Sequence, residues 1–360
     1  MRKLIAAACA TSLAAALSVA FAGSAAAKTT IVVGPGQSIQ AAVNRAHPGD
    51  TVRIKPGVYH QTVQIRKDGI TLRGSGNSPG GTVLKPPKAF PNTLCTKTFG
   101  PSGVCVLAKK LDLKSGAVIT PVHNDTVTNM RITGFPATGV FGFGTDGLRV
   151  TRVVAIKDGG YGIARFDSTR SVFAHNTAIG NEEAGLYVGD SPHADSVVRD
   201  NHASGNELGI FIRHARHVLV AGNHVTGNCE GILVLDDGQK GGAGNVNIRH
   251  NIIVKNNKFC PKSEDTPALK GGGVLLLGAT FSKVVRNHVA GNSGRQINSG
   301  GIVVFSAKAL TGGSNPKFDA IVHNFAFRNH PADLIWDGSG NHIKFVANHC
   351  AKSIPAGLCH

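Results

Sequence analysis

The chain has 360 residues, of which 46 are glycine, 6% are aromatic and 41% are hydrophobic. The hydrophobic content excludes a disordered chain, and the many glycines argue against a long helical bundle. The formal net charge of +17 favours an anionic partner, such as an acidic polysaccharide or an anionic cell-wall polymer. Nucleic acid is an unlikely partner on sequence grounds, because no nucleic-acid-binding motif is found.

The amino end predicts a cleaved secretory signal peptide over residues 1–27. Arg2 and Lys3 precede an apolar run that ends near Phe21, and Ala25-Ala26-Ala27 offers a cleavage site. No later apolar run approaches the roughly 20 residues that span a bilayer, so no membrane span is expected. We therefore expect a secreted, extracellular protein, and its positive charge also suits retention on an anionic cell wall.

Residues 28–78 predict a capping helix followed by the first short strands. Ser38 suits the N-cap position, because its hydroxyl can accept a hydrogen bond from a free amide of the first turn. Apolar residues then recur at helical spacing at Ile39, Ala42, Val43 and Ala46. Strands are expected at 51–54, 62–65 and 70–74. Such a helix would plug the open end of a solenoid and prevent edge pairing.

The cysteines that follow the signal peptide fall into sequence-local couples. An even number in an exported chain predicts disulfides, and no CxxC spacing suggests structural zinc. The expected pairs are Cys95 with Cys105, Cys229 with Cys260, and Cys350 with Cys359. The first pair would fasten a loop on a coil formed by residues 79–115. The last pair would close a tail over residues 350–360.

A repeat with a period in the low twenties dominates residues 116–349. Six segments carry asparagines five positions apart: NTAIGN (176–181), NHASGN (201–206), NHVTGN (223–228), NIIVKN (251–256), NHVAGN (287–292) and NFAFRN (324–329). One coil of about 22–25 residues cannot bury its apolar face alone, so stacked coils of a solenoid are predicted. We interpret the asparagines as structural ladders, because Asn tolerates left-handed corners and its amide can bond the next Asn in the stack.

Each repeat leads to a glycine-led apolar strand. One column of these strands is expected inside: Val140, Ile163, Leu186, Ile210, Ile232, Val274, Ile302 and Leu334. The next column should point outward, yet it is also apolar. Either a loop or a partner subunit covers it, or Phe141, Tyr187 and Phe211 form a platform on which sugar rings stack. Longer loops on both sides of the strand predict a walled groove, at 236–245, 257–272, 293–300 and 307–316.

These features resemble a known family. Residues 34–74, with IQAAV, PGDTV, PGVY and GITLRG, resemble the amino end of secreted right-handed parallel β-helix proteins of the pectin-lyase-like superfamily. The coils from 129 to 349 look like the generic repeat of that superfamily. The resemblance implies an all-β fold, a right-handed parallel β-helix solenoid with an N-terminal capping helix. The superfamily includes polysaccharide lyases, polygalacturonases, C-5 epimerases and non-catalytic proteins, so it leaves the activity open.

The end of the glycine-led strand carries the most informative column. Successive coils place Asp167, Asp190, His214 and Asp236 at the same offset. Stacked coils would bring neighbours to about 5 Å. Carboxylates that close raise one another's pKa, and a cation between them reverses this effect. The column is therefore a candidate for general acid–base chemistry or for a Ca²⁺ site.

The segment YVGDSPH, which begins at Tyr187, is similar to the Tyr-Gly-x-Asp-Pro-His motif of alginate C-5 epimerases. By that resemblance Asp190 and His193 would be acid–base groups and Tyr187 a proton donor. The segment departs from the motif because Ser191 is inserted before Pro192.

Two classes of function remain open. In a secreted enzyme acting on an acidic polysaccharide as a lyase, epimerase or hydrolase, Arg213 or Ca²⁺ would neutralise the uronate and His214 or His193 would be the base. Asp237 joins the aromatic residues as a substrate-binding candidate. Two aspartates with a water between them would instead suit inverting hydrolysis. The alternative is a non-catalytic β-helix that binds cell-wall glycan or metal, the latter at the neighbouring His202 and His224.

Overall fold

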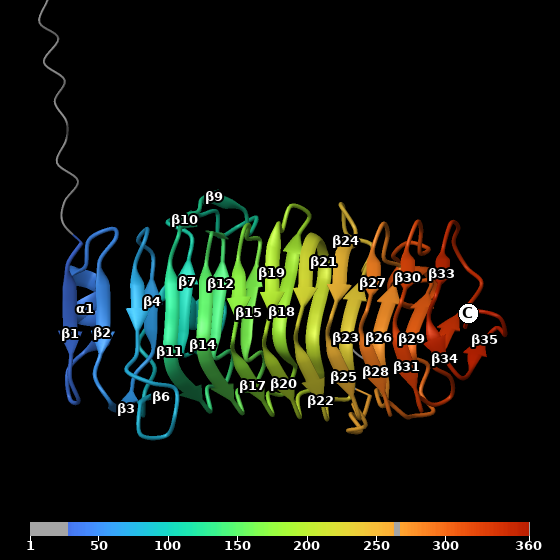
Figure 1. Cartoon of the computed structure of the whole chain (residues 1–360). Helices are drawn as coiled ribbons and strands as arrows, with labels where there is room; N and C mark the ends of the chain where they lie inside the picture. The colour runs from blue at the N-terminus through green and yellow to red at the C-terminus, as the bar shows by residue number, and fades with distance from the viewer. Residues whose placement is uncertain (1–27, 263–266, 360) are drawn as a thin grey trace, which may run out of the picture.

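The computed structural model describes residues 28–262 and 267–359, so the predicted signal peptide over 1–27 lies outside the described residues. The described chain winds as a solenoid whose coils stack along one axis, from the amino end to the carboxyl end (Figure 1). Named strands of neighbouring coils pair in parallel, and a short side hairpin, β8 (Lys110–Leu111) with β9 (Val118–Thr120), is antiparallel. The predicted all-β parallel solenoid is confirmed.

Each coil passes in turn through three parallel sheets. Sheet 1 contains the glycine-led strands together with β4, β32 and β35. Its strands are β4 (Val63–Ile65), β7 (Val104–Leu107), β12 (Val140–Phe143), β15 (Ile163–Phe166), β18 (Ala184–Ser191), the start of β21 (Leu208–Ala221), β23 (Glu230–Leu235), β26 (Gly272–Leu277), β29 (Gly300–Phe305), β32 (Leu334–Trp336) and β35 (Ser353–Ile354). Sheet 2 holds β1 (Thr30–Val33), β2 (Thr51–Ile54), β5 (Thr71–Arg73), the starts of β11 (Thr126–Thr133) and β14 (Arg149–Ile156), β16 (Val172–Ala174), β19 (Ser196–Arg199), the end of β21, β24 (Gly244–Arg249), β27 (Lys283–Val285), β30 (Ala320–Val322) and β33 (Lys344–Val346). Sheet 3 holds β3 (Gly57–His60), β6 (Thr82–Lys85), the ends of β11 and β14, β17 (Thr177–Ile179), β20 (His202–Ser204), β22 (His224–Thr226), β25 (Ile252–Val254), β28 (His288–Ala290), β31 (Phe325–Phe327) and β34 (His349–Cys350).

The predicted capping helix is α1 (Ile39–Arg45). The Ser38 hydroxyl accepts a hydrogen bond of 3.1 Å from the Ala41 amide, as expected of an N-cap. Ile39, Ala42 and Val43 are buried against the first coil. The helix thus covers apolar side chains that would otherwise open to solvent at the end of the stack.

The interior of the solenoid is a continuous apolar core. The column predicted to point inward is 0% exposed throughout: Val140, Ile163, Leu186, Ile210, Ile232, Val274, Ile302 and Leu334. Strands of sheets 2 and 3 add alternate side chains to the same core, among them Val198, Val225 and Ile253. At roughly 25 cal/mol per Å² of apolar surface, this burial is the main stabilising contribution to the fold.

Two ladders of stacked amides fix the corners on either side of sheet 3. In the first, the Asn223 Oδ1 accepts bonds from the backbone N–H of Asn201 at 3.0 Å and from its side-chain amide at 2.9 Å. The Asn223 amide in turn donates to Asn251 in the next coil at 2.9 Å. The first ladder comprises Asn176, Asn201, Asn223, Asn251, Asn287, Asn324 and Asn348. The second comprises Asp158, Asn181, Asn206, Asn228, Asn256, Asn292, Asn329 and Asp333.

Protein side chains cover the outward apolar column of sheet 1, as in the first of the two interpretations. Phe99, which follows α2 (Leu94–Thr98), packs on Phe141 with ring centres 5.2 Å apart. Farther along, the loop bearing Cys260 and Leu269 packs over the sheet. Near the carboxyl end, Ala307 after β29 covers it in the same way.

The three predicted disulfides are all formed, Cys95–Cys105, Cys229–Cys260 and Cys350–Cys359. Across residues 28–262 and 267–359, no helix has the length and apolar character needed to span a membrane.

Candidate functional site

A pocket of about 400 Å³ opens at the corner that follows sheet 1. Its floor includes three predicted residues from two neighbouring coils, Asp167, Asp190 and His193. The turn of the β8–β9 hairpin, residues 115–118, forms one wall. This wall was not predicted from the sequence, although the Ser115-Gly116 pair is typical of a turn.

The backbone at this corner explains why the side chains stack. Asp167, Asp190 and His214 all adopt the left-handed conformation, with φ of 43°, 49° and 46°. Asp and His tolerate this conformation better than most residues. Their strands pair in register, Phe166 with Gly189 and Gly189 with Arg213. The three side chains therefore leave the chain at equivalent points of consecutive coils, separated by about 4.8 Å.

Asp190 and His214 form the central pair of the site. The Nδ1 atom of His214 lies 3.7 Å from the Asp190 Oδ1, with 8% and 25% of the two side chains exposed. Its Nε2 atom lies 2.7 Å from the Lys240 carbonyl oxygen. A carbonyl can only accept, so Nε2 carries a hydrogen and Nδ1 is the nitrogen that faces Asp190. Neither Asp190 Oδ1 nor His214 Nδ1 has a hydrogen-bond partner among the described residues.

Asp167 differs from Asp190 in its surroundings. Partial desolvation raises the pKa of Asp167, and the neighbouring Asp190 adds to the rise, whereas His214 and Arg165 oppose it. The carboxyl of Asp167 therefore carries a proton more readily than an ordinary exposed aspartate does. A carboxyl with a raised pKa beside a second carboxyl at one pocket is a recurring arrangement of acid–base sites.

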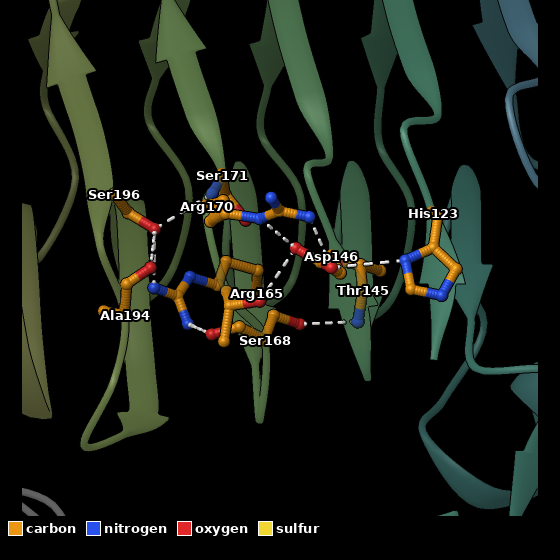
Figure 2. A network of polar contacts seen from close by, with 10 residues as sticks. His123, Thr145, Asp146, Arg165, Ser168, Arg170, Ser171, Ala194 and Ser196 are labelled. Atoms are coloured by element: carbon orange, nitrogen blue, oxygen red, sulfur yellow. Dashed lines mark hydrogen bonds and ion pairs between the residues drawn. The ribbon is translucent and has the colours of Figure 1, made fainter. Parts of the chain in front are cut away.

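A buried arginine lies directly behind the pocket floor. Arg165 on β15 is 0% exposed and donates to the Ser168 carbonyl at 2.5 Å and to the Ser196 hydroxyl at 2.9 Å (Figure 2). It also donates to the Ser191 hydroxyl. Burial lowers its pKa to about 9, so the guanidinium is still charged at neutral pH. Because Ser168 and Ser191 also line the pocket, this cation acts on the acidic floor from beneath. Sequence analysis missed it, although the alternation of GIARF places Arg165 on the same face as Ile163.

An exposed ion-pair network braces the rim beside the hairpin. Both Asp146 oxygens accept bonds from Arg170 at 2.6 Å, and Thr169 donates to the same carboxylate at 2.9 Å (Figure 2). His123 lies 3.2 Å away on the other side. Arg170, more than any other neighbour, holds the pKa of Asp146 below its usual range. Since Thr169 lines the pocket, the network fixes one edge of it.

Tyr187 lies on the outer face of sheet 1 and is 0% exposed. Tyr161 and Phe166 pack against it, each with ring centres 4.6 Å from its own. Burial raises the pKa of the Tyr187 phenol, and Asp190 adds to the rise while Arg213 opposes it. Its hydroxyl lies over Gly189, where a Cβ atom would collide with it.

The predicted sugar platform is thus largely closed. Phe141 is 6% exposed, and of the three aromatic rings only Phe211 is partly exposed. Arg213 is ion-paired with Asp237 at 2.8 Å. Both lie beside the aromatic cluster and do not line the pocket of Asp167 and Asp190.

Asp236 departs from the rest of its predicted column. Its two carboxylate oxygens accept the Gly238 and Ser314 amides, each at 3.0 Å, and its carbonyl accepts from Thr311 at 2.7 Å. It therefore ties the loop after β23 to the loop after β29. These loops line a separate pocket of about 400 Å³ and do not wall the first one.

The described residues contain no cluster of three or more His, Cys, Asp or Glu side chains suited to a metal ion. The Ca²⁺ expectation is not tested by this finding. The His202 and His224 rings are neighbours, with centres 5.1 Å apart.

Several known proteins share this architecture. The A-module of the Azotobacter vinelandii mannuronan C-5 epimerase AlgE4 superposes with a TM-score of 0.56 at 18% identity, over 88% of this chain and 94% of that chain. The alginate lyase from Paenibacillus sp. str. FPU-7 gives 0.57 at 15% identity, over 87% and 99%. The Yersinia enterocolitica family 28 exopolygalacturonase gives 0.52 at 11% identity, over 91% and 76%. At these identities the likeness establishes the fold alone.

No curated protein matches the chain. The family model described as the right-handed beta helix region matches residues 64–207 and 138–316, which together cover well over half of the sequence. The predicted handedness is thereby confirmed, and the chain belongs to the right-handed β-helix family.

Proposed function

We propose that this protein is a secreted carbohydrate-active enzyme that transfers protons on an acidic polysaccharide at the corner after sheet 1. The observation that carries the proposal is the Asp190–His214 pair. The Asp190 Oδ1 and the His214 Nδ1 face each other at 3.7 Å, and neither atom has a hydrogen-bond partner among the described residues. Facing polar atoms that lack partners are costly when buried, so their presence at a pocket is typical of a functional site.

The roles follow from exposure. Asp190 reaches the pocket, whereas His214 lies behind it and is anchored by the Lys240 carbonyl. Asp190 would accept the proton from C5 of a uronate, and a protonated His214 would stabilise the carboxylate charge across the short gap. Asp167, whose pKa is raised, would supply the proton that the reaction consumes.

The proton balance distinguishes two outcomes. In β-elimination the C5–H bond breaks, a C4–C5 double bond forms, the C4–O bond breaks and the leaving oxygen takes the proton from Asp167. In epimerisation the C4–O bond stays intact and a proton returns to C5 from the opposite face. Hydrolysis remains the third option, with Asp167 and Asp190 as its two carboxyls.

The charge and the known proteins of this fold support an acidic substrate. The formal net charge of +17 attracts polyanions. The similar structures are named as a mannuronan C-5 epimerase, an alginate lyase and an exopolygalacturonase. Arg165 adds positive charge behind the pocket, and Ca²⁺ held by Asp167 and Asp190 would add more.

The test is proton NMR in D₂O of residues 28–360 with alginate, polygalacturonate and sulfated glycans, with Ca²⁺ and then with chelator. Vinylic signals identify a lyase, deuterium at C5 an epimerase, and new reducing ends alone a hydrolase. We expect Asp190→Asn to lower turnover at least about a hundredfold. The control is Asp195→Asn, an exposed aspartate that does not line the pocket. Equal turnover of both variants would refute the assignment.

The non-catalytic alternative has one observation in its favour. Tyr187 is 0% exposed, so a proton donor at this position could not reach a substrate without movement of the aromatic cluster. A folded protein that leaves the whole panel unchanged but retains glycans would establish a binding role.

A further inference from the structure

A second charged feature lies at another corner of the solenoid, between sheets 2 and 3. Seven of the 16 histidines follow the corner between sheets 2 and 3, on either side of the first asparagine ladder. We call this set the histidine ridge: His175, His202, His224, His250, His288, His323 and His349. All are exposed except His202, which is half-buried. Each coil passes through sheet 2 between the pocket corner and this corner, so a strand of sheet 2 separates the ridge from the pocket of Asp190.

The ladder places these side chains at regular intervals. His175, His250 and His323 occupy left-handed corner positions, with φ of 58°, 54° and 54°. The other four begin strands of sheet 3, two residues later than the corner. His202 pairs in register with His224. The buried ladder asparagines fix the spacing, so each of seven consecutive coils supplies one imidazole, at an interval of about 4.8 Å along the axis. The imidazoles lie in two neighbouring columns, one on each side of the ladder.

The neighbouring charges are mostly positive. Four arginines lie beside the ridge, at the ends of sheet 2 strands or at the corner that follows them: Arg152, Arg199, Arg249 and Arg286. Among the described residues at this corner, the carboxylate is that of Asp200. It forms an ion pair with Arg199 at 2.6 Å and lies 3.9 Å from the His175 ring nitrogen. It is therefore already neutralised and does not offset the rest of the line.

Charged groups farther out on the packed elements are mostly basic. The exposed carboxylates there are Asp195 and, past the end of sheet 3, Glu182 and Glu183. Asp195, at the far corner of sheet 2, lies 3.6 Å from His217. The exposed basic side chains on these two sheets and their far corners include Arg149, Lys157, Arg170, Lys255, Lys283, Arg328 and Lys344, with Arg53, Arg73 and Lys85 in the first coils.

We propose that the histidine ridge is a docking surface for a linear anionic polysaccharide, and that acidification strengthens the docking. The polysaccharide class rests on the proposed function; the linear shape and the charge sign rest on the ridge itself. A row of cationic groups at a constant interval complements a chain with regularly spaced anionic groups better than it complements a compact ligand. Histidine is the side chain whose ordinary charge change falls between about pH 5 and about pH 8, so the docking should respond to pH in that range.

Binding and protonation are linked in this arrangement. Burial lowers the pKa of His202, and the adjacent His224 lowers it further. A bound polyanion places negative charge beside the imidazoles and raises their pKa, so binding takes up protons and becomes tighter as the pH falls. Each imidazole whose pKa rises by one unit contributes up to about a tenfold gain in affinity at acid pH.

The experiment measures the affinity of the protein for a size-fractionated alginate oligomer, in chelator, at about pH 5.5 and about pH 7.5. We expect at least about tenfold tighter binding at the lower pH, with proton uptake seen by calorimetry in buffers of different ionisation enthalpy. The ridge variant His224→Gln/His250→Gln/His288→Gln should lose most of this gain. All three side chains are exposed, so the fold should be kept, which thermal unfolding checks.

The matched control replaces three exposed histidines outside the ridge, His47→Gln/His217→Gln/His342→Gln. Affinity that does not change with pH, or an equal loss in both triple variants, overturns the proposal. The outcome is independent of catalysis, because the ridge variant should retain turnover on short oligosaccharides. Asp190→Asn, conversely, should retain pH-dependent binding even if it is inactive or if the proposed function fails.

Discussion

The asparagine ladders and the acidic corner after sheet 1 both arise from one position repeated in consecutive coils, but they differ in whether the repeated side chains are hydrogen-bonded. In the ladder, Asn201 and Asn223 satisfy each other and the backbone with bonds of about 3 Å. At the corner after sheet 1, Asp190 and His214 face each other at 3.7 Å with both facing atoms unbonded.

This difference distinguishes residues that stabilise the fold from residues that can act on a ligand. A ladder amide already uses its donors and acceptor, so it has nothing left for a ligand. The corner keeps unbonded polar atoms at a pocket, which a folded chain tolerates only at some cost in stability. Substitutions should therefore change the free energy of unfolding most in the ladder and least at the corner.

The largest loss is expected from Asn228→Ala. Asn228 accepts two bonds from Asn206, at 2.9 and 3.0 Å, and donates to Ala203 and Asn256 at 3.1 and 2.9 Å. Its removal leaves several buried groups without partners, and we expect a loss of about 3–5 kcal/mol in the free energy of unfolding. Denaturant unfolding measures it. The exposed Asn341→Ala serves as control, and equal stability of the two variants would show that the ladder bonds contribute little.

A smaller and pH-dependent gain is expected from Asp158→Asn. Asp158 begins the second ladder, and its amide donates to Asn181 Oδ1 at 3.1 Å while its own Oδ2 has no partner. Burial raises its pKa to about 8. The stability that protonated Asp158 contributes is therefore complete below its unfolded pKa of about 4 and lost as the pH rises through about 8.

An asparagine at position 158 carries a side-chain N–H₂ donor at every pH, whereas Asp158 has a side-chain donor only when it is protonated. Asp158→Asn should match the native protein near pH 4 and exceed it by about 2 kcal/mol near pH 8. Denaturant unfolding across this range measures the difference. Asp125 and Asp319, whose pKa values are also raised by burial, stay in both proteins and cancel. A constant difference between the two curves would contradict the explanation.

The sequence predicted what a local repeat encodes. The five-residue spacing of the asparagines sets the register of every coil, and the same register brought Asp167, Asp190 and His214 together. The repeat could not predict that the Asp236 carboxylate binds a loop and does not join this group, because its partner Ser314 lies 78 positions away in the sequence. The β8–β9 wall of the pocket was missed for the same reason. Arg165 was missed because a buried cation without a carboxylate is contrary to the usual pattern.

Arg165→Met probes the link between the core and the corner. The hydroxyls of Ser191 and Ser196 keep their bonds to the Gly189 and Ala194 carbonyls, at 2.8 and 2.6 Å, when the guanidinium is removed. Since a buried charge is also relieved, the free energy of unfolding should stay the same or rise by about 1 kcal/mol. The pKa of Asp167 should rise further, because Arg165 opposes its present rise. Carboxyl NMR titration measures the pKa, and an unchanged value would remove Arg165 from the site.

The smallest change in stability is expected from Asp190→Asn. Asp190 is 25% exposed, and its Oδ1 makes no hydrogen bond whose loss could cost stability. The loss of its attraction to His214 should change the free energy of unfolding by less than about 1 kcal/mol. The same substitution removes the proton acceptor from the pocket, so turnover should fall while the unfolding curve stays in place. Asn228→Ala should lower the free energy of unfolding while the molecules that remain folded keep their turnover, because Asn228 does not line the pocket. If Asp190→Asn instead destabilises the fold as much as Asn228→Ala, the corner is a structural column like the ladder, and the site must be sought elsewhere on sheet 1.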